Sequence, residues 1–324
     1  MNACAAGFLL HQPSRVVLCH IYPQNGPRAD VDHPNRETFP LSPLFMKQSE
    51  IIDNLRREIK RLRTVISETS PDLQSLLKAR GLSIYKCQPA QDLLLPEAAH
   101  IDSYYRKLLH YSFRIFLRDV IKHQEQFSVS QVTRYTSPAV AEEYIDYMVD
   151  IGLLEKLGSR TFRLARRPIR SFGATLEWLL AEIFTRELGV EAVWGVKFRR
   201  HGVGGDYDIL AKINCSLLYM EIKSSPPKQM LANHIAAFLD RIGDLHPGIS
   251  IFFMDTELRM NDKIVPMFEE ELSRRDTHPP EIKRMENELF SVENTIFIMN
   301  SSGTIRGNIE RILMEFFNPD MQTP

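Results

Sequence analysis

Cysteine is scarce in this chain, and its few copies stand far apart. The four are Cys4, Cys19, Cys87 and Cys215, without the paired spacing that holds a structural zinc ion. A disulfide framework needs closer and more numerous cysteines, so the pattern favours a reducing, cytoplasmic environment. The sequence therefore argues against both a zinc site and a disulfide-stapled domain.

Long apolar runs and a surplus of one charge sign are also missing. No stretch approaches the roughly 20 apolar residues that span a bilayer, and residues 1–20 lack the basic start and apolar centre of a signal peptide. The formal net charge of -1 provides no global positive field for nucleic acid. We expect a cytoplasmic protein without a membrane partner, nucleoid-associated if its source is bacterial or archaeal, that contacts nucleic acid only through local basic patches.

What the chain has is the composition of an ordinary globular protein, with 44% hydrophobic and 25% charged residues. Its 324 residues suffice for about two domains. Residues 1–45 are rich in Pro, Asn, Asp and His without periodicity, which predicts a disordered or weakly ordered leader. Whether this leader belongs to the native protein is open, because Met46 begins a far more regular segment. Residues 319–324 are expected to form a tail.

Residues 46–100 are predicted to form a helical, coiled-coil-like arm and a linker. Between residues 46 and 67, apolar residues recur every three or four positions among many arginines and lysines, as in an amphipathic helix. These apolar residues are Ile52, Leu55, Ile59, Leu62 and Ile66. They cover only about two heptads, fewer than a firm coiled-coil assignment needs. Three interpretations stay open: a homodimer through residues 46–67, a basic surface that contacts DNA, or a helix packed on its own domain.

Residues 101–168 have the pattern of a winged helix. A long helix is expected from Ile101 to His123, a short one from Ser128, and a third after the Ser137-Pro138 cap. Two short strands around Gly158-Ser159 follow as the wing. Three helices and a hairpin resemble winged helix-turn-helix domains.

Basic residues cluster over the wing and its exit, where they are candidates for phosphate contacts. They include Arg160, Arg163, Arg166 and Arg167. The third helix instead carries Glu142, Glu143, Asp146 and Asp150, a poor match for the major groove of DNA. We therefore weigh a protein-interaction or packing role for this region nearly equally with DNA binding.

Residues 169–318 alternate helices with apolar strands, which predicts an α/β domain. The strand candidates at 248–255 and 295–300 are almost continuously apolar, as in the centre of a sheet covered on both faces. Helices are expected at 173–188, 228–242, 263–274 and 304–317. The expected fold class is α/β, with a mixed central sheet flanked by helices and a helical, winged-helix region before it.

Charged residues interrupt an apolar hairpin in this domain. If the turn is symmetric about Asn214-Cys215, Asp208 lies opposite Glu221, and Asp206 lies opposite Lys223. Alternation along strands then places all four side chains on one face. Directly opposed carboxylates are close enough to share a divalent cation. A lysine beside them suits metal-assisted phosphodiester hydrolysis, although Lys223 is also able to satisfy Glu221 as a structural ion pair.

This hairpin resembles the active site of the PD-(D/E)XK, or restriction-endonuclease-like, nuclease superfamily. The matching residues are Asp208, the apolar pair Ile209-Leu210, and Glu221-Ile222-Lys223 at the end of the next strand. The family also has a glutamate on the helix before the hairpin, and Glu177 matches it. The similar stretch covers roughly residues 170–255.

One departure concerns the first acid of the motif, because the family has one where this chain has Asp206 and Asp208. Asp208 directly precedes the apolar strand residues and is favoured, with Asp206 a helper or a turn residue.

The resemblance implies a metal-dependent endonuclease that hydrolyses phosphodiester bonds in DNA. Asp208, Glu221, the Ile222 carbonyl and Glu177 would hold Mg²⁺ or Mn²⁺, and Lys223 would orient the attacking water. The alternatives are a catalytically inactive nuclease-fold protein that binds DNA or acts as a scaffold, and a coiled-coil adaptor.

Further basic residues surround this hairpin in the sequence and would suit a polyanionic substrate. They are Lys197, Arg199, Arg200 and Lys228. Ser224, Ser225 and His234 are additional candidates for the phosphate backbone, although such a histidine is more often a satisfied surface group.

Overall fold

The computed structural model describes residues 43–89, 91–133, 136–199 and 206–318. The chain divides into two compact units, residues 1–49 and 50–324. Of the first unit only residues 43–49 are described, and they begin helix α1 (Pro43–Thr69). Most of the expected leader and the whole expected tail therefore lie outside the described residues.

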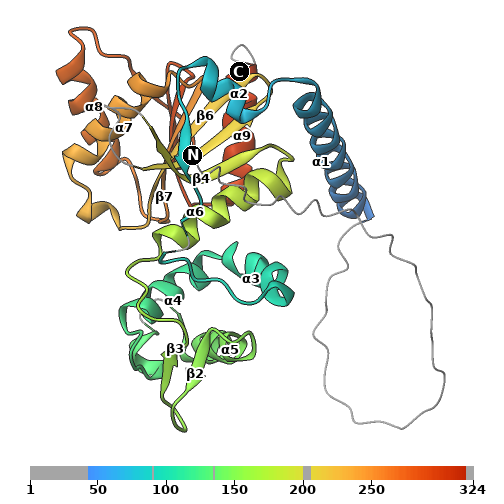
Figure 1. Cartoon of the computed structure of the whole chain (residues 1–324), viewed down its shortest axis with the longest axis vertical. Helices are drawn as coiled ribbons and strands as arrows, with labels where there is room; N and C mark the ends of the chain where they lie inside the picture. Colours follow the sequence, from blue (N-terminus) through green and yellow to red (C-terminus); the bar gives the residue numbers. More distant parts are fainter. Residues whose placement is uncertain (1–42, 90, 134–135, 200–205, 319–324) are drawn as a thin grey trace, which may run out of the picture. The chain divides into compact units, whose positions relative to one another are not determined.

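An eight-stranded mixed sheet dominates the described part of the second unit (Figure 1). Its strand order is β1-β4-β5-β6-β7-β10-β9-β8. The β6–β7 and β7–β10 pairs are parallel, and the others are antiparallel. The strands are β1 Ile84–Lys86, β4 Ala192–Phe198, β5 Tyr207–Ile213, β6 Ser216–Lys223, β7 Ile249–Met254, β8 Ile282–Glu286, β9 Leu289–Val292 and β10 Ile296–Asn300. The α/β class with a mixed sheet is confirmed.

Helices cover both faces of this sheet, and each face has its own hydrophobic core. One face packs against α6 (Gly173–Glu182), its π-helical continuation Ile183–Glu187, and α9 (Ile305–Phe317). The other packs against α2 (Leu73–Ala79), α7 (Ala232–Leu245) and α8 (Ile264–Arg275). All six residues of β7 are buried, as expected for a central strand between two helical layers. None of the described helices is long and apolar enough to cross a membrane.

Residues 98–164 add helices and one hairpin to the face that carries α6. They form α3 (Ile101–Leu108), α4 (Tyr111–Lys122), a 3₁₀ turn (Val129–Gln131), α5 (Pro138–Asp150), β2 (Leu154–Lys156) and β3 (Phe162–Leu164). As expected, Ser137 caps α5, its hydroxyl accepting from the Val140 amide at 3.4 Å. Buried residues of these helices and of α6 share one core. Their assignment to a winged helix stays a prediction.

The single helix expected from Ile101 to His123 is wrong. The chain leaves the helical conformation at His110, whose ψ is 123°, and so separates α3 from α4. The guanidinium of Arg114 donates to the carbonyls of Leu108 at 2.8 Å and Leu109 at 3.0 Å. These bonds satisfy carbonyls that the end of a helix leaves free. Arg114 is itself held by Asp255, from a distant part of the sequence.

The arm-and-linker assignment of residues 46–100 also needs correction. Leu73 and Leu77 of α2 are buried in the sheet's second core, and β1 pairs with β4 as an edge strand. Residues 73–86 therefore belong to the α/β domain. The β8–β9 hairpin was not expected at all, and the helix after β6 begins at Ala232 rather than Lys228, behind a 3₁₀ turn at Pro227–Gln229.

Candidate functional site

The hairpin of β5 and β6 has the register that the sequence predicts. It turns at Asn214, whose φ of 54° lies in the left-handed region that asparagine tolerates. The ladder pairs Ile209 with Met220. One step further along the same ladder, Asp208 falls opposite Glu221, so the two acids come together at the open end of the hairpin.

Asp208 is half-buried, and its carboxylate is bound to the neighbouring strand. Its Oδ2 accepts a hydrogen bond from the Ile222 amide at 2.7 Å. Burial and the nearby charge of Glu221 raise the pKa of Asp208 to about 8, against the smaller opposing effects of Lys223 and this amide. The cations around Asp208 are therefore too few to keep its carboxyl ionised at neutral pH.

Glu221 is buried, with 2% of its surface exposed, and it is held by three side chains. Lys223 Nζ lies 2.6 Å from Oε1, and Arg241 Nη1 lies 2.7 Å from Oε2. The Tyr219 hydroxyl also donates to Oε2. Burial alone would raise the pKa of Glu221, but Lys223 and Arg241 outweigh it and lower the pKa below its ordinary value.

Glu177, on α6, turns toward the same place. Burial raises its pKa to about 9, with further contributions from Asp208, Asp206 and Glu221. Burial disfavours the charged form of a carboxyl, and the charges of neighbouring acids disfavour it further. The structure thus gathers Glu177, Asp208 and Glu221 around one end of the β5–β6 hairpin.

Gly195 makes room for Pro89 next to Glu177. Its φ is +58°, and a Cβ at this position would lie 2.4 Å from Pro89 Cδ and 3.6 Å from Glu177 Oε2. The β4–β5 register places Gly195 opposite Asp208, between the pairs Trp194–Ile209 and Val196–Tyr207.

Both strands change faces at this point. Trp194 and Ile209 belong to one core, while Val196 and Tyr207 belong to the other. Residues two apart in a regular strand share a face, so the ladder is distorted beside Asp208. The sequence signal for this distortion was a glycine inside an apolar strand.

Sequence reasoning missed Arg241. It follows Phe238 by one helical turn on α7, and Phe238 is fully buried, so Arg241 stands at a core-facing position. An arginine at such a spacing signals a buried acid that needs a partner, and that acid is Glu221.

The acids have the chemistry of a site for a hard divalent cation, since carboxylate and carbonyl oxygens are the ligands that Mg²⁺ and Mn²⁺ prefer. Within the described part of the chain, no three His, Cys, Asp or Glu residues already stand as a ready metal cage. The donors that fit best are Asp208, Glu221 and the Ile222 carbonyl.

Asp206 differs from Asp208 in its surroundings. It precedes β5, is exposed, and forms an ion pair with Lys197 at 2.8 Å. This pair raises the pKa of Lys197. The negative charge of Asp206 compensates part of the positive charge that Lys197 presents to a ligand. Arg199 and Lys228 are exposed. Arg200 and the glycines between it and β5 lie outside the described residues.

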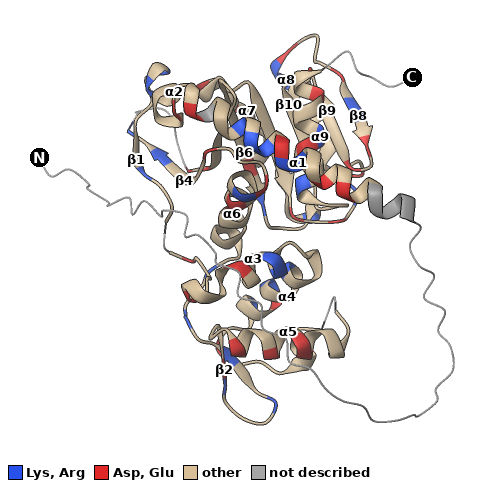
Figure 2. Ribbon diagram, turned by 90° about the vertical axis from the view of Figure 1, so that its right-hand side faces the viewer, with Lys and Arg blue, Asp and Glu red and all other residues tan. Residues whose placement is uncertain are grey.

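The basic residues of the wing are partly neutralised within the protein. Arg163 pairs with Glu155 at 2.6 Å, and Arg167 pairs with Glu125 at 3.4 Å. Arg160 and Arg166 are exposed. Figure 2 shows acidic residues recurring along α5, which contains no Lys or Arg.

His234 lies in the first turn of α7 and makes no hydrogen bond to the acids among the described residues. Its Nδ1 accepts from the Leu231 amide at 3.3 Å. Burial and the nearby charge of Lys223 lower its pKa, which places the imidazole close to the site in neutral form.

Comparison with solved structures gives distant similarities. No protein-family model and no curated protein matches the sequence. Among solved structures, Can2 from Sulfobacillus thermosulfidooxidans, in complex with cyclic tetra-adenylate, is 11% identical with a TM-score of 0.45. The match covers 76% of this chain and 60% of Can2, so the chain spans about three-fifths of that protein. Protein VC1899 from Vibrio cholerae is 13% identical with a TM-score of 0.36, over 61% and 55% of the two chains.

Proposed function

We propose that this chain is a metal-dependent endonuclease that hydrolyses phosphodiester bonds in DNA. The observation that carries the proposal is the hairpin register, which sets Asp208 opposite Glu221 with the Lys223 amine 2.6 Å from Glu221. A merely structural ion pair would need one acid and one cation. Here Asp208 and Glu177 both feel the charge of Glu221, and both have raised pKa values.

Asp208, Glu221 and the Ile222 carbonyl would hold Mg²⁺ or Mn²⁺, with Glu177 completing the set. Such an ion, when bound, lowers the pKa of water and offsets charge on phosphoryl oxygens. Lys223 supplies a fixed ammonium next to these oxygens, where it orients the attacking water and stabilises developing negative charge. Arg241 and Tyr219 hold Oε2 of Glu221, and Lys223 binds Oε1.

The protonation states give this site a pH dependence. Asp208 and Glu177, with pKa values of about 8 and 9, carry protons at neutral pH in the free protein. Binding of a cation requires their ionised forms and so releases these protons. Metal affinity, and with it the rate of hydrolysis, rises as the pH increases from 6 to 9.

Metal binding and plasmid nicking by the same samples test the proposal. Calorimetry with Mn²⁺ compares wild type with Asp208→Asn and Glu221→Gln. Asp206→Asn is the matched control, because it makes the same change at an exposed residue two positions away. We expect both activities to survive in the control and to vanish in the other two variants. A folded wild type that neither binds Mn²⁺ nor nicks DNA leaves the inactive, DNA-binding scaffold as the function.

DNA is the partner that the exposed basic residues around the site favour. Arg199 follows the end of β4, Lys228 follows the end of β6, and both are exposed. These two strands are the neighbours of β5, which carries Asp208. Phosphates attract such side chains without reading sequence. The wing residues Arg160 and Arg166 supply a second basic surface.

We also propose that α1 pairs with α1 of a second copy. One side of the helix contacts its own domain, where Arg56 lies 3.7 Å from Glu310. The other side leaves a heptad-spaced apolar row between 41% and 59% exposed, formed by Ile52, Leu55, Ile59, Leu62 and Ile66. Sedimentation equilibrium is expected to show a dimer for wild type and a monomer for Leu55→Asp/Leu62→Asp. A wild-type monomer would contradict this pairing.

A further inference from the structure

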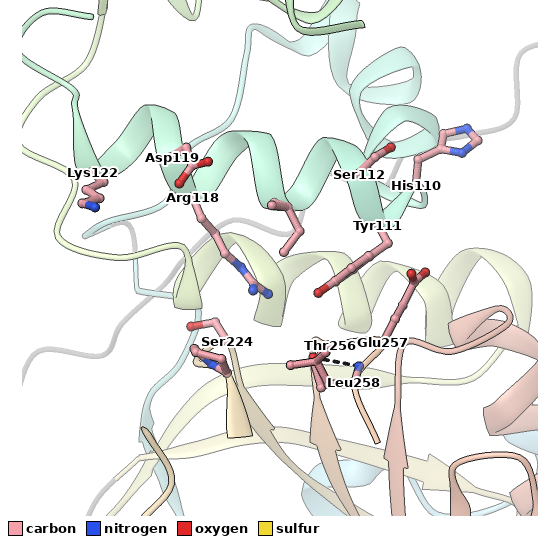
Figure 3. Close-up of a pocket in the computed structure, with 12 residues that line it drawn as sticks. His110, Tyr111, Ser112, Arg118, Asp119, Lys122, Ser224, Thr256, Glu257 and Leu258 are labelled. Carbon is pink, nitrogen blue, oxygen red and sulfur yellow. Dashed lines mark hydrogen bonds between the residues drawn. The ribbon is translucent and has the colours of Figure 1, made fainter. Parts of the chain in front are cut away.

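A cavity of about 740 Å³ adjoins the proposed metal site (Figure 3). It lies between α4 and the segments that follow β6 and β7. Its lining includes Ser224, the residue directly after Lys223. The Lys223 carbonyl accepts from the Asp255 amide at 2.9 Å, so the ends of β6 and β7 are joined at the cavity's edge.

The walls of this cavity are fixed by a buried ion cluster. Arg114 and Arg118 of α4 both bind Asp255, with Arg114 Nε 2.9 Å from Oδ1 and Arg118 Nη2 2.9 Å from the carbonyl. Ser301 also donates to Asp255 at 2.6 Å. Because two guanidinium groups share one carboxylate, the cluster keeps a net positive charge beside the cavity. These contacts fix α4 against the end of β7, and Asp119 and Glu257 set two acids against the cations of the lining.

The lining combines apolar walls with polar ends. Tyr111 and Ile115 of α4 face Pro226 and Leu258 across the cavity, and Figure 3 shows Tyr111 and Arg118 directed from the helix toward the strand ends. Arg118 and Lys122 provide cations on the side of Ser224. Carboxylates of Asp119 and Glu257 also line it and are able to accept from amino groups.

A second cavity of about 360 Å³ shares Arg118, Lys122 and Ser224 with the first. It extends to Arg170 and Phe172, which precede α6, the helix that carries Glu177. A row of cations thus leads from the first cavity past Ser224 to the start of α6. Such a row matches the repeated phosphates of a nucleic-acid strand.

We infer that the larger cavity binds one nucleotide of the substrate strand, next to the phosphate that is cut. This inference rests on the proposed nuclease function and adds a base-binding subsite to it. A planar base fits between Tyr111, Ile115 and Pro226, because bases stack on aromatic and apolar surfaces. Its phosphate lies toward Arg118, Lys122 and Ser224, and the chain continues to the acids beyond Lys223. The volume is in the range of small-ligand pockets.

Saturation-transfer NMR with deoxyadenosine monophosphate in EDTA tests the subsite without any cleavage. Wild type is expected to saturate the base protons most strongly, whereas deoxyribose phosphate gives little signal. Ile115→Trp fills the cavity and is expected to abolish the transfer, while Ile59→Trp, the same change on the exposed side of α1, leaves it intact. An oligothymidylate is expected to displace the nucleotide, which identifies a strand rather than a free nucleotide as the occupant.

Lys122→Glu keeps the test independent of folding, since Lys122 is exposed. It is expected to weaken nucleotide binding at least tenfold relative to Lys283→Glu, a charge reversal at an exposed residue of β8. No transfer to wild type, equal transfer to Ile115→Trp, or no displacement by the oligonucleotide would overturn the subsite. Metal-stimulated nicking stays measurable in each case, so a failed subsite is distinguishable from a failed nuclease.

Discussion

At the scale of single residues, Glu221 is the centre of the site because each of its oxygens has a separate task. Oε2 is bound by Arg241 and Tyr219, whereas Oε1 is contacted by Lys223. A buried carboxylate without such partners would be protonated. The arginine on α7 therefore keeps Glu221 ionised and fixes its orientation.

Replacement of Arg241 by methionine should expose this role. Loss of the cation raises the pKa of Glu221, so the acid limb of the pH–rate profile for nicking moves to higher pH, and the rate at pH 7 falls at least about tenfold. Arg241→Lys should restore part of the lost rate because it restores the charge. An unshifted pH profile in Arg241→Met would show that Arg241 only fills space.

Asp208 makes a second prediction, which concerns stability in EDTA. Its pKa of about 8 when folded exceeds the ordinary value of 3.8, so the folded state binds the proton more tightly than the unfolded state. The free energy of unfolding therefore falls as the pH rises from about 4 to about 8. Asp208→Asn removes this contribution, so its free energy of unfolding should fall less steeply with pH. Between pH 4 and pH 8 the fall should be smaller than in wild type by at least about 1 kcal/mol, or roughly 2–4 °C in Tm. Urea titrations at several pH values check this against Asp206→Asn, which should keep the wild-type slope.

At the scale of elements, the β4–β5–β6 segment shows what local patterns predict and what they leave out. The register about Asn214 follows from a two-residue turn between apolar runs, so the pairing of Asp208 with Glu221 was predictable. The change of faces at Gly195 was not, because strict alternation assumes a regular ladder. The need for a glycine at position 195 comes from Pro89, far away in the sequence.

Gly195→Ala should disturb both the fold and the site. The new methyl group would overlap Pro89, and φ of +58° is unfavourable for alanine, so a loss of about 1–3 kcal/mol is expected. Urea denaturation measures it. Gly158→Ala is the control, since a Cβ there meets nothing within 4 Å, and its stability should stay within about 0.5 kcal/mol of wild type. Equal stabilities of the two variants would contradict this account of Gly195.

At the scale of the molecule, α4 is attached to the sheet through Asp255. This residue follows β7, is fully buried, and binds Arg114, which is 1% exposed. Removal of one partner from a buried ion pair leaves an uncompensated charge.

Asp255→Asn should therefore cost about 3–5 kcal/mol of stability. Asp240→Asn is its surface control: Asp240 pairs with Arg275 at 2.8 Å but is 67% exposed, so its loss should cost about 1 kcal/mol or less. Chemical denaturation, followed by far-UV circular dichroism, measures the free energy of unfolding of both variants. A cost for Asp255→Asn as small as that of the control would remove this ion pair as the link between α4 and the sheet.

Long-range contacts explain why the whole fold was only partly predictable. Periodicity identified the buried strands β7 and β10 and the helices around them, because their burial is continuous. It missed β8, whose sequence is mostly charged, and it joined α3 to α4, because the break at His110 depends on Arg114 and Asp255. Arg241 escaped notice for the same reason: its partner Glu221 lies on another element.

The nicking rate of Lys223→Met in Mn²⁺ tests the central claim most directly. Lys223 is not a proposed metal ligand, so the variant should still bind Mn²⁺ while its nicking rate falls about 10²–10³-fold, the usual effect of losing one group that stabilises the transition state. Lys197→Met, which removes a lysine paired with Asp206, should nick DNA within a few-fold of wild type. Undiminished nicking by Lys223→Met would place the hydrolysis elsewhere and contradict the account.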